Sequence, residues 1–185
     1  MADYDRGLTA VRYPRDTVSE LFADVECPPF ELGRARALVT HEKPDLAVLG
    51  FGVMAIEAMR ALEHLNGHGE YKVSVYDARF AKPVDRELLE DLLGRGIPVV
   101  TVEDHSVRGG FGSCVLEACN ELGLDTRLVT RLGLPDSWIY QGERNEQLVE
   151  AGLDAASIAR TIRGVLDGPE HEPVVDVMQR EAVKR

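Results

Sequence analysis

The sequence predicts an α/β domain in which a mostly parallel sheet is covered by helices on both faces. Apolar runs of strand length alternate with segments whose apolar residues recur at helical spacing. Glycine or a capping acid stands at several of the junctions between them. The length agrees with this class, because 185 residues suffice for one domain with a full core and some extra chain at the ends.

Strands are expected at the short apolar or valine-rich runs. Residues 46–50, Leu-Ala-Val-Leu-Gly, form an apolar run that stops at glycine, which is typical of a buried parallel strand. Residues 71–76 are rich in valine and tyrosine, which favours a second strand. Three further strands are predicted at 97–102, at 126–131 and at 35–39, the last one pairing at an edge of the sheet.

Helices are expected in the segments between these strands. The first, 54–65, has its apolar residues on one face. Asp85 is placed to cap the second, and Gly94 and Gly96 end it. Two more are predicted, one from the glycine-rich residues 109–112 to about Gly123 and one at about 154–166.

The net charge of −11 argues against nucleic acid and anionic membranes as partners, because an acidic surface repels both. No apolar run is long enough to span a bilayer, and the first residues lack the basic and apolar parts of a signal peptide. Cys27, Cys114 and Cys119 form no CxxC pair, which suggests reduced thiols in a cytoplasmic protein. No spacing of Cys, His or acidic residues indicates a metal site.

Gly50-Phe51-Gly52-Val53-Met54-Ala55 fits the G-x-G-x-x-A pattern between a strand and a helix, and Asp77 stands at the end of the next strand. In dinucleotide-binding proteins such glycines let a pyrophosphate approach the helix N-terminus. The alternative is a tight strand-to-helix turn that needs small residues. Both interpretations stay open at this point.

Two further polar segments follow strand ends, where α/β proteins place their sites. In residues 77–83, Asp77 and Arg79 are either part of a ligand site or a pair that fixes a turn, and we favour the turn. In residues 103–106, Glu103, His105 and Ser106 could suggest acyl-transfer chemistry. The sequence lacks the G-x-S-x-G elbow, so we favour a buried hydrogen-bonded loop.

Six short segments occur in the order and spacing typical of 1-deoxy-D-xylulose-5-phosphate synthases. They are Arg12-Tyr13-Pro14-Arg15, Asp77-Ala78-Arg79-Phe80-Ala81-Lys82-Pro83, Thr101-Val102-Glu103-Asp104-His105, Gly109-Gly110-Phe111-Gly112-Ser113, Leu132-Gly133-Leu134-Pro135-Asp136 and Gly152-Leu153-Asp154. The chain thus resembles the C-terminal, transketolase-type domain of that family over residues 8–166.

The resemblance implies a three-layer α/β/α fold with about five mostly parallel strands and one antiparallel edge. It also implies three parts: the end of a pyrimidine-binding domain with a linker at 1–32, the transketolase-type domain at 33–167 and a flexible tail at 168–185. In such enzymes two other domains bind thiamine diphosphate and magnesium and condense pyruvate with glyceraldehyde 3-phosphate, an entry step to isoprenoid precursors and thiamine.

We therefore expect this chain to bind no cofactor and to be inactive alone. Its expected role is that of a structural and dimerisation domain, with the remaining domains of the enzyme and a second copy as partners. Two rival interpretations remain. One is a free-standing nucleotide-binding or regulatory module that uses Gly50, Gly52 and Asp77. The other is the equivalent domain of a 2-oxoacid dehydrogenase β-subunit.

One residue role is implied by position in the resemblance. Arg15 matches the arginine with which these synthases bind the phosphate of glyceraldehyde 3-phosphate, and a planar guanidinium suits a phosphate dianion. Asp16 departs from the family, which usually has glycine there. A carboxylate beside Arg15 could pair with it and weaken the phosphate site, or point away from it.

Overall fold

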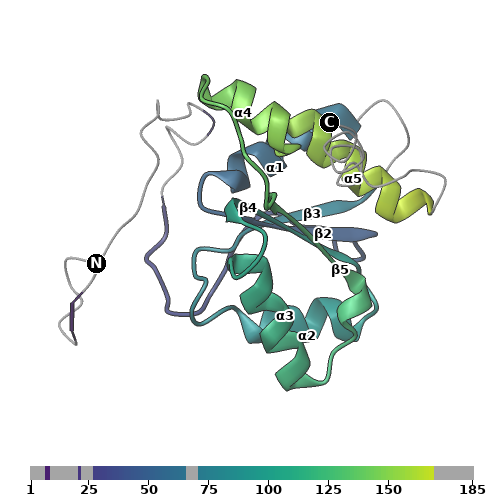
Figure 1. The fold of residues 1–185 in the computed structure, drawn as a ribbon. Helices are drawn as coiled ribbons and strands as arrows, with labels where there is room; N and C mark the ends of the chain where they lie inside the picture. Colours follow the sequence, from purple (N-terminus) through teal and green to yellow (C-terminus); the bar gives the residue numbers. More distant parts are fainter. Residues whose placement is uncertain (1–6, 9–20, 22–26, 66–70, 169–185) are drawn as a thin grey trace.

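The structure is a computed structural model and describes residues 7–8, 21, 27–65 and 71–168, which form one sheet between two layers of helices (Figure 1). The strands are β1 Arg36–Val39, β2 Leu46–Phe51, β3 Val73–Asp77, β4 Val99–Ser106 and β5 Val129–Leu134. The helices are α1 Met54–Leu65, α2 Arg86–Gly94, α3 Phe111–Leu122, the short 3-10 helix η2 Thr126–Leu128, α4 Arg144–Ala151 and α5 Ala155–Asp167.

The sheet is parallel except at one edge. Its strand order is β1-β3-β2-β4-β5, and only β1 runs antiparallel to its neighbour, with Arg36 opposite Asp77. The expected mostly parallel sheet with one antiparallel edge is therefore confirmed. Because α1 and α3 follow the adjacent strands β2 and β4 on opposite faces, the order of the sheet reverses between these two strands, and sheets of this kind bind ligands at such a switch point.

Two apolar layers hold the sheet between the helices. Helices α1, α4 and α5 cover one face, while α2 and α3 cover the other (Figure 1). Strand β2 serves both layers, because Leu46 and Val48 join the first and Ala47 and Leu49 join the second. These four side chains are all buried, which explains why the strand is an uninterrupted apolar run.

Most element boundaries agree with the sequence predictions. The carboxylate of Asp85 accepts the N–H of Leu88 at 3.1 Å, so it caps α2 as expected. The predicted stop near Gly123 is the C-cap of α3, and α5 lies within one residue of the expected range.

Two predictions of local structure were wrong. The strand expected at 126–131 begins only at Val129, because the Asp125 carboxylate accepts the N–H of Arg127 and turns residues Thr126–Leu128 into a 3-10 helix. Helix α4 was not predicted. It buries only Leu148, so it shows little apolar periodicity, and it starts with a capping box formed by Glu143 and Glu146.

Candidate functional site

The candidate residues identified from the sequence gather at the carboxyl ends of the parallel strands. Gly50 lies near the end of β2 and Asp77 ends β3, while Glu103 and His105 lie in the last half of β4. The loops that follow these strands run along the same side of the domain (Figure 1). Arg15 lies outside the described residues.

The two glycines of the G-x-G segment form a tight turn between β2 and α1. A Cβ at Gly50 would overlap the backbone of Ala55, because helix and strand approach closely here. Gly52 has a φ of +64°, a conformation that glycine adopts without strain. The Gly50 carbonyl accepts the N–H of Ala78 at 2.9 Å, which continues the ladder between β2 and β3. Packing and backbone geometry within the chain therefore account for both glycines.

An aromatic pair lies between the end of β2 and the start of α3, the helix that follows the neighbouring strand β4. Phe51, the last residue of β2, stacks on Phe111, the first residue of α3, with ring centroids 4.9 Å apart and planes 9° from parallel. Phe111 is buried, and Phe51 packs against the same apolar layer. These rings occupy the space between the end of one strand and the helix that follows its neighbour.

Asp77 turns back toward its own loop. Its Oδ1 accepts the N–H of Arg79 at 3.1 Å, and its Oδ2 lies 3.7 Å from the Arg79 Nε. Burial raises the pKa of Asp77 above its ordinary value, although the Arg79 amide, the Arg79 guanidinium and Arg36 act in the opposite direction. A raised pKa means that folding favours the protonated form of Asp77. Its ionisation therefore lowers the free energy of unfolding as pH rises from the ordinary pKa through the raised one.

The Arg79 side chain is almost fully buried, with 5% of its surface exposed. Its two terminal nitrogens donate to the carbonyl oxygens of Pro28 and Pro29, both at 3.3 Å. The guanidinium carbon lies 4.5 Å from the centre of the Phe30 ring. Arg79 therefore binds the chain segment that leads into the domain.

Glu103 is fully buried, and its carboxylate is engaged at the start of α3. Oε2 accepts the N–H of Phe111 at 2.6 Å, and Oε1 accepts the N–H of Gly112 at 2.8 Å. These amides are among the unpaired donors of the first helical turn, where a negative charge is favourable. A Cβ at Gly110 would overlap the Glu103 carboxylate, so this close approach requires glycine.

His105 and the serines do not form a nucleophilic site with Glu103. His105 is exposed, whereas the Glu103 carboxylate is buried among the amides of α3. The hydroxyl of Ser113 accepts the N–H of Gly109 at 2.9 Å and an N–H of Arg131 at 3.0 Å. These bonds hold the loop between β4 and α3 in place.

Two arginines that hold the end of β4 and the loop after it were not identified from the sequence. Arg131, in β5, donates to the Val107 carbonyl at 2.9 Å and so anchors the loop that precedes α3. Its charge within an apolar strand was a signal that could have identified it. Arg144, in α4, lies 2.6 Å from Asp104, and this ion pair joins α4 to the end of β4. Asp104 and Arg144 are 40 residues apart, so no local pattern could have paired them.

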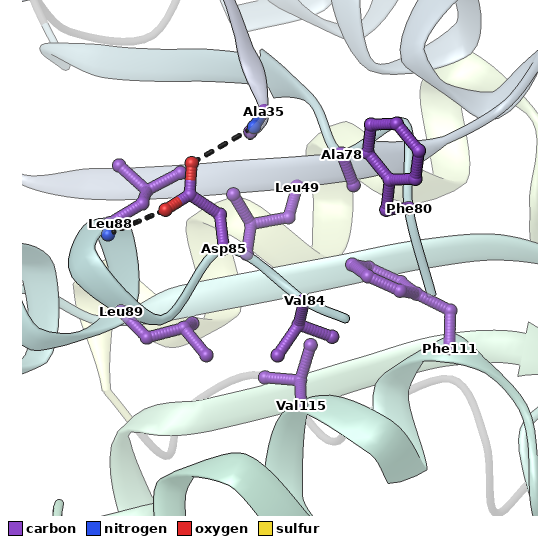
Figure 2. Close-up of a pocket in the computed structure, with 10 residues that line it drawn as sticks. All are labelled: Ala35, Leu49, Ala78, Phe80, Val84, Asp85, Leu88, Leu89, Phe111 and Val115. Atoms are coloured by element: carbon purple, nitrogen blue, oxygen red, sulfur yellow. Dashed lines mark hydrogen bonds between the residues drawn. The ribbon is translucent and has the colours of Figure 1, made fainter. Parts of the chain in front are cut away.

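A small apolar pocket lies between the sheet and helices α2 and α3 (Figure 2). Its lining residues are Ala35, Leu49, Ala78, Phe80, Val84, Asp85, Leu88, Leu89, Phe111 and Val115. Figure 2 shows that the carboxylate of Asp85 accepts hydrogen bonds from the backbone N–H groups of Ala35 and Leu88. The cavity volume is about 10 Å³, near the least that one water molecule needs, so it is a packing gap rather than a ligand site.

Within residues 27–65 and 71–168, no group of three or more His, Cys, Asp or Glu side chains is arranged to hold a metal ion. None of the helices in this part of the chain has the length and hydropathy of a membrane span.

Comparison with known proteins identifies relatives of the whole domain. The family model for the transketolase C-terminal domain matches residues 35–158. The 1-deoxy-D-xylulose-5-phosphate synthase of Geobacillus sp. (strain WCH70) is 37% identical over 163 residues, which is 88% of this chain and 25% of the relative. The synthase of Pseudomonas aeruginosa (strain LESB58) is 38% identical over 161 residues, 87% of this chain and 24% of the relative.

A solved structure agrees with these matches. The chain of a split-gene transketolase, described as an inactive beta4 tetramer, has a TM-score of 0.61 and 32% identity over 75% of this chain and 43% of its own length. The present chain spans about a quarter of the length of the curated synthases that it matches. From the family match, the sheet order and the sequence identity together, the chain belongs to the transketolase C-terminal domain family.

Proposed function

We propose that this chain is the C-terminal domain of a 1-deoxy-D-xylulose-5-phosphate synthase and that it supports the enzyme without carrying its chemistry. The observation that carries the proposal is the match to such synthases over 88% of the chain, together with its restriction to 25% of their length. In the intact enzyme, pyruvate would be decarboxylated and its two-carbon unit joined to glyceraldehyde 3-phosphate. This product would feed isoprenoid-precursor and thiamine synthesis.

The start of α3 does not fit the diphosphate of thiamine diphosphate. A diphosphate needs free N–H donors or cations, and helix N-termini commonly supply them. At α3 the Glu103 carboxylate already accepts the N–H groups of Phe111 and Gly112, and its charge would repel a phosphate. We therefore assign thiamine diphosphate and its magnesium to other domains of the enzyme, and we derive no step of the reaction through this chain.

We further propose that the intact enzyme is a cytoplasmic homodimer and that this domain contributes to its assembly. The split-gene transketolase relative supports a role in assembly without activity, since that chain is described as an inactive tetramer of beta subunits. Arg15 is proposed to bind the phosphate of glyceraldehyde 3-phosphate in the assembled enzyme.

Two assays test the proposal. The purified chain, supplied with pyruvate, glyceraldehyde 3-phosphate, thiamine diphosphate and magnesium, should form no deoxyxylulose phosphate. A chimera in which this chain replaces the matching region of the Pseudomonas aeruginosa synthase should form it. Product that tracks the concentration of the isolated chain would contradict the first expectation, and a folded, dimeric but inactive chimera would contradict the second.

The rival nucleotide-binding function is tested separately. Calorimetric titration of the chain with NAD and with ATP should give no binding heat, because the Gly50 turn is filled by the backbone of α1 and Asp77 bonds to its own loop. Saturable binding of either nucleotide that is lost in an Asp77→Asn variant would favour the rival.

A further inference from the structure

Residues 27–35 precede β1 and lie against the loop and helix start that follow β3, residues 77–87. We call the first the entry segment and the second the β3–α2 loop. Phe30 packs edge-on against Phe80, with ring centroids 6.0 Å apart. Further along, Arg34 lies 2.6 Å from Glu87, and the Ala35 N–H donates to Asp85 at 2.9 Å. Contacts therefore follow the entry segment from one end to the other.

Arg79 makes the contacts with the first residues of the entry segment. Pro28 and Pro29 have no N–H groups, so the only backbone polar groups they offer are carbonyl oxygens. The guanidinium of Arg79 has two terminal nitrogens, and each donates to one of these carbonyls at 3.3 Å. The planar guanidinium thus offers two N–H donors to two adjacent carbonyl oxygens. Its positive charge also lies over the face of the Phe30 ring.

The backbone conformation of Arg79 would favour glycine at this position. Its φ is +57°, in the left-handed region that glycine adopts freely and that other residues adopt only at a cost. The turn alone would therefore be served better by glycine. An arginine at this position, with its side chain 5% exposed, indicates that the guanidinium itself is required.

We propose that Arg79 is a latch that holds the entry segment on the β3–α2 loop and so fixes the position of residues 27–30 on the surface of the domain. Arg79 acts as a positioning residue, since it touches no reacting group. Arg79 follows β3, an interior strand that pairs with β1 on one side and β2 on the other, so the entry segment is tied to the loop after an interior strand.

Hydrogen exchange of the full chain tests the latch. Arg79→Gly removes the guanidinium but keeps the left-handed turn free of strain, so misfolding is not expected to obscure the result. Loss of two charge-assisted hydrogen bonds should speed exchange in residues 30–35, measured at the hydrogen-bonded amides of Arg34 and Ala35, by roughly ten- to a hundredfold. Amides of β2 and β4 should keep their wild-type rates.

Two other variants sharpen the test. Arg79→Lys keeps the charge but not the fork, so its exchange in residues 30–35 should be intermediate. Arg95→Ala is the matched control, because Arg95 also donates to a backbone carbonyl, that of Glu42 at 2.7 Å, but far from the entry segment. It should leave exchange in residues 30–35 unchanged. Cleavage by chymotrypsin after the exposed Phe30 should follow the same order.

Two outcomes would overturn the latch. Unchanged exchange in residues 30–35 of Arg79→Gly would mean that Asp85 and Arg34 hold the entry segment without Arg79. Equal acceleration in the entry segment and in β2 and β4 would mean that Arg79 supports the domain as a whole and does not position one segment.

Discussion

Replacing Glu103 with glutamine tests whether its carboxylate holds the start of α3. The amide oxygen of glutamine can accept from only one of the two backbone N–H groups that Glu103 now binds, and its NH2 group would face the other. One buried donor is then left without an acceptor, at a cost of about 1–3 kcal/mol. Loss of the negative charge at the helix N-terminus adds about 1 kcal/mol.

Removing the charge also has a favourable effect, because a buried carboxylate is costly to desolvate and a neutral amide is less so. The two short, charge-assisted hydrogen bonds should outweigh this gain. We therefore expect the free energy of unfolding to fall by about 2–4 kcal/mol. For a domain of this size that corresponds to a melting temperature lower by roughly 5–15 °C.

Thermal unfolding followed by circular dichroism measures this change. Glu117→Gln is the matched control, because it removes the same charge from an exposed position of the same helix and should shift stability by less than about 0.5 kcal/mol. Hydrogen exchange at Phe111 and Gly112 should also become faster in the Glu103 variant alone. If Glu103→Gln melts at or above the temperature of the control, relief of desolvation dominates and the reasoning fails.

Three further predictions concern Gly110, the Asp125–Arg127 pair and Arg15. Gly110→Ala should destabilise the chain by about 2–4 kcal/mol in chemical unfolding, because the new Cβ displaces the Glu103 carboxylate, and wild-type stability would contradict this. The Arg127 guanidinium lowers the pKa of Asp125 from its ordinary 3.8 to about 2, so their pairing contributes stability above pH 3.8 and loses it as pH falls through about 2. An NMR titration should find this midpoint, and Arg127→Ala should return it toward 3.8; an unchanged midpoint would refute the pairing. In the intact enzyme, Arg15→Ala should reduce kcat/KM for glyceraldehyde 3-phosphate by roughly thirty- to a hundredfold with pyruvate KM unchanged, and an equal loss with a phosphate-free aldehyde would end that role.

The fold was largely predictable because the strands of the sheet are buried on both faces. Such strands are short apolar runs, as at Leu46–Phe51, and the helices between them have one apolar side. Helix α4 escaped because it packs one leucine, and no apolar period marks it. The turn Thr126–Leu128 escaped because it depends on one hydrogen bond that the Asp125 carboxylate accepts from the N–H of Arg127, and this bond competes with the strand propensity of the residues that follow.

The candidate site was predictable in position but not in its bonds. Polar residues after strand ends are expected at one edge of a parallel sheet, and the residues identified there do lie at that edge. Their partners could not be deduced in the same way. Glu103 accepts from amides eight and nine residues later, and Arg79 donates to carbonyls 50 and 51 residues earlier. Both contacts depend on how close the turns approach, which a linear pattern does not contain.

Strand β1 protects the sheet against association through its edge. It is four residues long, begins with a charged residue and has a bulge, and these features make a poor template for another strand. Its hydrogen-bonded neighbour is β3, whose residues Val73, Ser74 and Val75 are all buried. A chain shortened past Val39 would expose the open backbone of β3 as a flat apolar edge, which is the arrangement that favours aggregation. Any trimmed version of this domain should therefore begin before Gly33, so that the protecting strand and its approach stay attached.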